Sequence, residues 1–226
     1  MISASTLKRL AKLKQKKYRE AERLFLTEGQ SLVEEASVPP VHLLTDPNAV
    51  RRLSTLTTPT GPVAVFPFLD VSPEELVLNR DRIVLLYGVQ DPGNVGTIVR
   101  AAHAFGAGVA LTKGTADLYN PKTVRATMGS IFHAPVSREL DAPGFLALSH
   151  ASGFETAAAV PQGGDMPGSL PAGRLVIVVG AEGSGLPEEV VEACSRRVSI
   201  PALAASLNAA VAASILLYEA YMHVLP

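Results

Sequence analysis

The segment from Asp91 to Arg100 holds residue types that could act on a hydroxyl group or a phosphate. Gly93 and Gly96 would let the backbone approach a ligand closely, and the Asn94 amide can both donate and accept hydrogen bonds. Arg100 follows Gly96 by about one helical turn, so its guanidinium can reach back over the loop toward a phosphate or a hydroxyl that loses its proton. An ordinary loop followed by a solvated helix face would also explain this segment.

A second segment, Val179-Gly-Ala-Glu-Gly-Ser-Gly185, places Glu182 in a glycine-rich loop. Its glycines do not have the G-x-G-x-x-G spacing of a dinucleotide-binding loop. A carboxylate in such a loop disfavours phosphate and suits a cation or a hydroxyl donor. Glu182 could therefore contact a cofactor or a substrate ribose, or pair with an arginine such as Arg100. A tight turn with no chemical role is the alternative.

A third segment begins with Ile200-Pro201, at the end of an expected strand, and finishes with Ser206-Leu207-Asn208. Serine is a favoured N-cap residue, so we expect Ser206 to cap the last helix and Asn208 to lie in its first turn. A capping serine needs no catalytic role, which is the structural alternative for this segment.

The elements around these segments alternate between strand and helix. Apolar runs predict strands at 83–87, 109–111, 132–136, 156–160, 175–179 and 197–200, and helices are expected at 96–105, from 120, at 187–194 and at 207–224. This alternation predicts an α/β fold with a mostly parallel sheet and helices on both faces. Ligands bind beyond the carboxyl ends of the strands in such sheets, and all three polar segments follow a strand.

Residues 1–70 are expected to form a small α/β domain, joined by a linker at 71–80 to a larger domain at 81–226. Leu7, Leu10 and Leu13 alternate with lysines, which predicts a short amphipathic helix with one basic face. Residues 1–23 hold eight Lys or Arg against two Glu, a local charge of 8 − 2 = +6, whereas the whole chain carries −1. A basic block is typical of a protein that binds a polyanion, although a solvated helix would have the same composition.

The composition argues against several classes of protein. No apolar run is long enough to span a bilayer, and no apolar stretch follows the basic N-terminus to make a signal peptide. Cys194 is the single cysteine, so an internal disulfide is excluded and a reducing cytoplasm is the expected compartment. The five histidines are scattered without the spacing of metal ligands, so we expect no metal site.

Taken together and in this order, the three segments resemble the signature motifs of the SpoU/TrmH branch of the SPOUT RNA methyltransferases. A fourth stretch, Tyr119–Pro135, resembles another segment of the same family. In the first domain, Tyr18-Arg19-Glu20 and Phe25-Leu-Thr-Glu-Gly29 resemble the opening of the L30e-like substrate-binding domain that many members carry. The resemblance implies an enzyme that transfers a methyl group from S-adenosylmethionine to a ribose 2′-hydroxyl of RNA.

The resemblance also implies a fold and a set of site residues. The larger domain would be an α/β knot with a deep trefoil at its C-terminus, and the protein a homodimer whose last helix, around Val211–Leu217, forms part of the interface. Arg100 would promote loss of the hydroxyl proton, stabilise the alkoxide or hold the adjacent phosphate. The implied catalytic residues are Asn94, Arg100, Glu182, Ser206 and Asn208; the implied cofactor-binding residues are Thr112, Gly114, Gly180, Ile200 and Leu207; the candidate RNA contacts are Lys8, Lys12, Lys16 and Arg19.

Two departures from the family pattern leave other functions open. The stretch from Pro201 to Ser206 is shorter than the usual family loop, and Ala210 stands where the family usually has serine. A tighter cofactor loop, or an RNA-binding protein that has lost methylation, would both fit these changes. A nucleotide-binding α/β enzyme unrelated to RNA would leave the basic N-terminus unexplained. The L30e-like domain favours 23S ribosomal RNA as the substrate, with tRNA as the alternative.

Overall fold

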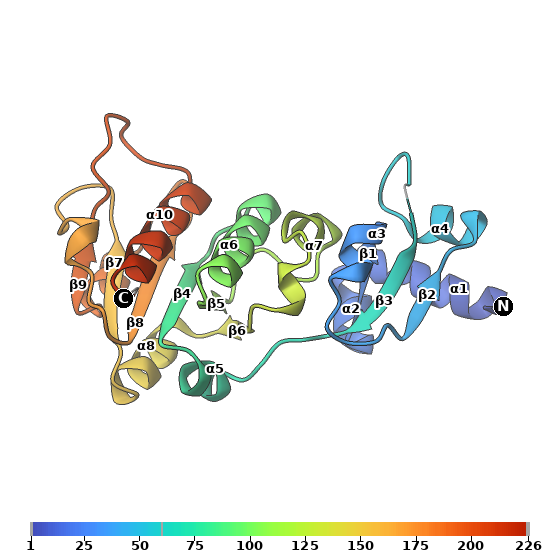
Figure 1. Ribbon diagram of the computed structural model, residues 1–226, viewed down its shortest axis with the longest axis horizontal. Helices are drawn as coiled ribbons and strands as arrows, with labels where there is room; N and C mark the ends of the chain where they lie inside the picture. The colour runs from blue at the N-terminus through green and yellow to red at the C-terminus, as the bar shows by residue number, and fades with distance from the viewer. Residues whose placement is uncertain (1, 60, 225–226) are drawn as a thin grey trace.

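The computed structural model describes residues 2–59 and 61–224. The first domain contains a three-stranded antiparallel sheet in the order β1-β3-β2. Helices cover this sheet, and the molecule is elongated, with this domain at one end (Figure 1). Its elements are α1 (Ala4–Leu10), η1 (Ala11–Lys14), α2 (Lys16–Glu22), β1 (Leu24–Glu28), α3 (Gln30–Glu34), β2 (His42–Leu44), α4 (Pro47–Leu53) and β3 (Val63–Pro67).

The second domain contains a six-stranded sheet in the order β6-β5-β4-β8-β7-β9, and all of its strand pairs are parallel. This confirms the predicted α/β fold. Its elements are α5 (Pro73–Asn79), β4 (Arg82–Tyr87), α6 (Pro92–Ala104), β5 (Gly108–Thr112), α7 (Pro121–Ala126), η2 (Ser130–Phe132), β6 (Val136–Leu140), α8 (Ala142–Ala151), β7 (Glu155–Ala159), η3 (Pro167–Ser169), β8 (Leu175–Gly180), α9 (Glu188–Glu192), β9 (Arg196–Val198) and α10 (Ala209–Met222).

The central strands are apolar along their length because helices cover both faces of the sheet. On β4, Val84 and Leu86 pack into the core beneath α6 and α10, which lie side by side in Figure 1. Ile83 and Leu85 point the other way, into a core that includes residues of α5 and α8. Among the described residues, no helix is long and apolar enough to cross a membrane.

The expected linker at 71–80 contains the helix α5. Ser72 caps this helix by accepting a hydrogen bond from the Glu75 backbone N–H at 3.0 Å, and Leu76 is fully buried against the sheet. The Ser-Pro-Glu-Glu start is a helix signal, but the helix has only seven residues and its apolar face is short. The chain between the domains is therefore short, and α5 packs with the second domain.

The expected strand at 132–136 is replaced by the turn η2, and β6 begins only at Val136. Phe132 is buried, with its ring centroid 6.2 Å from that of Phe25 and 4.8 Å from that of Phe66. Its apolar character thus reflects a contact with the first domain rather than a place in the sheet.

Candidate functional site

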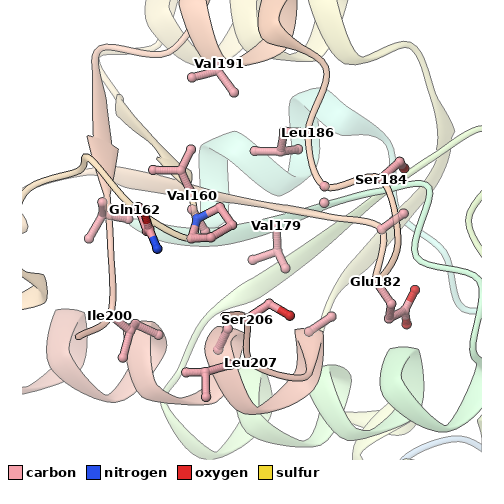
Figure 2. Close-up of a pocket in the computed structure, with 18 of the residues that line it drawn as sticks. Val160, Gln162, Val179, Glu182, Ser184, Leu186, Val191, Ile200, Ser206 and Leu207 are labelled. Atoms are coloured by element: carbon pink, nitrogen blue, oxygen red, sulfur yellow. The ribbon is translucent and has the colours of Figure 1, made fainter. Parts of the chain in front are cut away.

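The three polar segments meet beyond the carboxyl ends of β4, β8 and β9, as expected for ligand sites in parallel sheets. Beside them lies a cavity of about 470 Å³, bounded by the loops after β7, β8 and β9 and by α10. Figure 2 shows its side chains, with apolar residues along the walls. The lining includes Val160, Gln162, Val179, Gly180, Glu182, Ser184, Leu186, Val191, Ile200, Ser206, Leu207 and Leu216.

Three side chains, one from each segment, are joined by hydrogen bonds at the margin of this cavity. The Asn94 amide nitrogen donates to Glu182 Oε1 at 2.6 Å. The Asn208 amide nitrogen donates to Asn94 Oδ1 at 3.0 Å. We call this set the Glu182–Asn94–Asn208 chain. It fixes the carboxylate of Glu182 relative to two helix ends, and so makes one site from loops that are far apart in sequence.

Asn208, rather than Ser206, caps the last helix. Its Oδ1 accepts hydrogen bonds from the backbone N–H groups of Ala210 and Val211, at 2.9 and 3.2 Å. This corrects the expectation that Ser206 is the N-cap. Ser206 is left on an exposed loop, where it lines the cavity instead of serving the helix.

The start of α6 is held by Asp91, which accepts a hydrogen bond from the Asn94 backbone N–H at 3.0 Å. Lys122 donates to the same carboxylate at 3.0 Å. These two bonds lower the pKa of Asp91 below its ordinary value, since both stabilise the charged form. The helix therefore begins at Pro92, four residues before the expected Gly96, and Asn94 lies in its first turn.

Gly180 marks the point where the loop after β8 folds back on itself. A Cβ atom at this position would lie 2.3 Å from the Gly185 carbonyl carbon, so the approach of the two backbones requires glycine. Ala181 and Gly185 form an isolated antiparallel bridge that closes the turn. Glu182 is thereby presented from a tight loop rather than from a flexible one.

Arg100 lies apart from the Glu182–Asn94–Asn208 chain. It is exposed on α6, and within residues 2–59 and 61–224 its side chain makes no hydrogen bond or ion pair. Six residues separate it from Asn94, which places the two side chains on different faces of the helix and about 9 Å apart along its axis. A single copy of the chain does not bring these two predicted residues together.

The predicted cofactor residues fall into two groups. Gly180, Ile200 and Leu207 line the cavity, whereas Thr112 and Gly114 do not. The Thr112 hydroxyl is buried, donates to Leu86 O at 3.2 Å and accepts from the Gly88 N–H at 3.2 Å. Thr112 therefore ties the ends of β4 and β5, and its contact with a cofactor stays a prediction.

The candidate RNA contacts also divide. Lys8, Lys12 and Lys16 are exposed on α1, η1 and α2, in agreement with a basic surface. Arg19 is only 3% exposed and donates to Asp117 Oδ2 at 2.5 Å and to Leu13 O at 2.7 Å. This corrects the expectation that Arg19 contacts RNA, because its guanidinium is buried in an ion pair with the second domain.

The sequence reasoning missed the loop after β7, which supplies Val160, Pro161 and Gln162 to the cavity. The signal was present, because this loop also follows a predicted strand, but its residues suggest no chemistry. Among the described residues, no group of three or more His, Cys, Asp or Glu side chains could hold a metal ion.

Comparison with known proteins gives the same two-part organisation. The SpoU rRNA Methylase family matches residues 81–218, and the MRM3-like substrate binding domain matches residues 4–52. The 23S rRNA (guanosine(2553)-2′-O)-methyltransferase RlmP of Bacillus subtilis is 33% identical over 235 residues, which cover 92% of each chain.

Two solved structures agree with the fold over both domains. An AdoMet-bound rRNA methyltransferase from Sinorhizobium meliloti has a TM-score of 0.91 and 29% identity, over 100% of this chain and 98% of that one. The SpoU methyltransferase AviRb from Streptomyces viridochromogenes, in complex with AdoMet, has a TM-score of 0.86 and 26% identity, over 97% and 98% of the two chains.

Proposed function

Because this chain belongs to the SpoU rRNA methylase family of S-adenosylmethionine-dependent RNA methyltransferases, we propose that it methylates a ribose 2′-hydroxyl of 23S ribosomal RNA. The observation that carries the proposal is the Glu182–Asn94–Asn208 chain, which lies at the margin of the cavity. These side chains come from three segments that are far apart in sequence. Capping α10 requires only the Asn208 side-chain oxygen, so the hydrogen bonds that join the three side chains are not needed for the helix.

The residues of the cavity fit S-adenosylmethionine. Leu186, Ile200 and Leu207 offer apolar walls to an adenine ring, while the loop backbones offer N–H and C=O groups to its polar edge. The Glu182 carboxylate, which is exposed and lines the cavity, suits the positive charge of a sulfonium. When bound, the cofactor supplies an electrophilic methyl group on that sulfur.

The residues of the chain then have two tasks. The first is to hold the ribose so that the 2′-oxygen lies in line with the methyl group, and orientation of this kind accounts for much of an enzyme's acceleration. Glu182, fixed by Asn94, can accept a hydrogen bond from a ribose hydroxyl and so orient the sugar. Ser206, exposed on the cavity loop, can donate or accept a further hydrogen bond.

The second task is to favour loss of the hydroxyl proton, which we assign to Arg100. A guanidinium stays protonated in proteins, so Arg100 stabilises the developing alkoxide or the neighbouring phosphate rather than removing the proton itself. Since Arg100 lies away from Asn94 in one copy, we propose a homodimer in which the Arg100 of one subunit serves the site of the other.

An exposed apolar face on α10 supports this dimer. Val211, Tyr218 and Met222 recur at helical spacing and are 48%, 47% and 43% exposed. An apolar face of this kind on a helix next to α6 is typical of an interface between subunits. We also propose that the second domain contains a deep trefoil knot.

The choice of 23S ribosomal RNA rests on the first domain and on the relative from Bacillus subtilis, which acts on that RNA. Lys8 and Lys12 provide exposed positive charge for the phosphate backbone, and Lys16 is also exposed, although it pairs with Glu139 at 3.1 Å. Lys12 and Lys17 lie over the Tyr18 ring, 5.1 and 4.9 Å from its centroid, so the ring holds two of the ammonium groups close together on this surface. An RNA substrate and a free cysteine are both consistent with a cytoplasmic protein.

The test is transfer of labelled methyl groups from S-adenosylmethionine to purified 23S rRNA and, separately, to tRNA, both from cells that lack this gene. We expect label on 23S rRNA only, at a linkage that resists alkali, because a methylated 2′-oxygen cannot attack the adjacent phosphate. Label on tRNA alone would overturn the choice of substrate. RNA binding without label on either would indicate a non-catalytic member of the family.

A further inference from the structure

The two domains share one hydrophobic core. On β1, Phe25 faces the second domain, with its ring centroid 4.8 Å from that of Tyr119, while Leu26 faces the helices of its own domain. Phe66 on β3 joins the same shared core through Phe132. Domains joined by small polar contacts move relative to each other, whereas a buried apolar interface holds them in one orientation.

A buried ion pair closes one side of this shared core. The Arg19 and Asp117 side chains are 3% and 9% exposed and are joined at 2.5 Å. Asp117 also accepts a hydrogen bond from the Tyr119 N–H at 3.0 Å through its other oxygen. The pair thus connects α2 to the chain segment that carries Tyr119, and breaking it would leave a charge without a partner inside the protein.

A second buried carboxylate, Glu28, lies at the other end of β1. Its side chain is 4% exposed and pairs with Arg125 of α7 at 3.2 Å. Glu28 also accepts hydrogen bonds from the Ser54 and Thr55 hydroxyls and from the Thr55 N–H. Arg125 donates to the Thr55 hydroxyl at 2.7 Å, so the guanidinium contacts two segments of the first domain.

We propose that Arg19 and Glu28 are positioning residues: through Asp117 and Arg125 they lock the first domain in a fixed orientation, so that RNA held there meets the cavity at a set place. This inference rests on the proposed function. A rigid connection between the domains fixes the distance from the basic surface of the first domain to the Glu182–Asn94–Asn208 chain. Misplacement of a bound substrate by about 1 Å can cost about a hundredfold in rate.

The most informative variant is Asp117→Asn. Its remaining Oδ1 can still accept from the Tyr119 N–H, while the new NH₂ group cannot accept from Arg19. Glu28→Gln tests the other end of β1 in the same way. We expect each variant to lower kcat on 23S rRNA by about tenfold to a hundredfold, with cofactor and RNA affinities unchanged.

The matched control is Glu139→Gln. Lys16 and Glu139 also form an ion pair between the domains, at 3.1 Å, but their side chains are 51% and 50% exposed. Exposed pairs contribute little, so this variant should keep the wild-type kcat. An unchanged kcat in Asp117→Asn and Glu28→Gln, or a matching loss of cofactor affinity, would overturn the proposal.

Small-angle scattering and hydrogen exchange test the fixed orientation of the domains without any measurement of methyl transfer. They also show whether a variant is folded. We expect Asp117→Asn to have a broader range of dimensions and faster exchange in β1 and α7, with protection of β4 and β8 unchanged. If the wild-type protein transfers no methyl group, these measurements still test whether the two domains are held in a fixed orientation. Identical scattering and exchange in wild type and variant would refute it.

Discussion

At the scale of single residues, Asn208 uses the two ends of one amide differently. Its oxygen caps α10, and its nitrogen donates to Asn94. Asn208→Asp keeps a good cap but removes the donor, whereas Asn208→Ala removes both. We expect Asn208→Asp to keep the thermal stability of the wild type and lose about tenfold in kcat, since the Asn94 contact becomes repulsive.

Asn208→Ala should lose activity as well, and in addition about 1 kcal/mol of stability with the cap. Thermal unfolding and initial rates, measured on both variants, check the pair. An aspartate variant with full activity would show that the bond to Asn94 does not serve the reaction.

Asp70, near the junction of the domains, gives a pH dependence. Burial raises the pKa of this carboxyl, but the hydrogen bond from Tyr119 and the charges of Arg138 and Arg23 outweigh it, so the pKa lies below the ordinary 3.8. The unfolded chain therefore binds this proton more readily, and the stability from Asp70 is complete above about pH 4 and lost as the pH falls through the folded-state pKa.

We expect the free energy of unfolding to fall with pH below about 4 in the wild type, and less steeply in Asp70→Asn. Urea unfolding at a series of pH values between about 2 and 6 measures this. Parallel curves for the two proteins would mean that Asp70 does not contribute to acid sensitivity.

At the scale of elements, the loop after β8 depends on the close approach of Gly180 and Gly185. Gly180→Ala would drive its Cβ into the Gly185 carbonyl, whereas a Cβ at Gly173, outside the cavity, would meet no atom within 4 Å. We expect Gly180→Ala to lose cofactor affinity by about tenfold or more, because the loop that lines the cavity must shift, and Gly173→Ala to bind normally.

Calorimetric titration of S-adenosylmethionine into both variants tests this expectation. Circular dichroism should give nearly the same secondary structure for both, since Gly180 is only the last residue of β8. Equal affinities would show that the loop tolerates the extra atom.

Elements with long apolar runs were predictable from sequence. Elements with few apolar residues, or whose apolar residues contact the other domain, were not. The sequences of β4 and β8 are apolar without interruption because helices cover both faces of the sheet, and this pattern predicts buried strands. Helix α5 was missed because its Ser72-Pro73 start is typical of a linker as well as of a helix cap, and Phe132 was assigned to a strand because its partner lies in another domain.

Some residues of the candidate site were likewise predictable from sequence, and others were not. The loops of Asn94, Glu182 and Asn208 were predictable from motifs at strand ends, and their convergence follows from a parallel sheet. The burial of Arg19 was not predictable, because a basic residue among lysines looks like surface until Asp117, 98 residues away, is brought beside it. The cavity residues after β7 carry no chemical signal in the sequence.

At the scale of the whole molecule, the position of Arg100 argues for a site shared by two subunits. Arg100→Ala should keep cofactor affinity, since Arg100 does not line the cavity, and lose about a hundredfold or more in turnover. Asn94→Ala should also be inactive, because Glu182 loses its hydrogen-bond donor. The two variants damage different parts of one proposed site, and this makes a complementation experiment possible.

Mixing equal amounts of Arg100→Ala and Asn94→Ala subunits, after dissociation and reassembly, distinguishes a shared site from a site within one chain. Half of the dimers would be mixed, and each mixed dimer would pair an intact Asn94 with an intact Arg100 at one of its two sites. If Arg100 acts across the interface, about a quarter of the wild-type activity returns. If it acts within its own chain, every site carries one lesion and no activity returns. A control mixture with Val211→Arg in both variants, which places charge on the exposed face of α10, should prevent recovery by blocking the dimer.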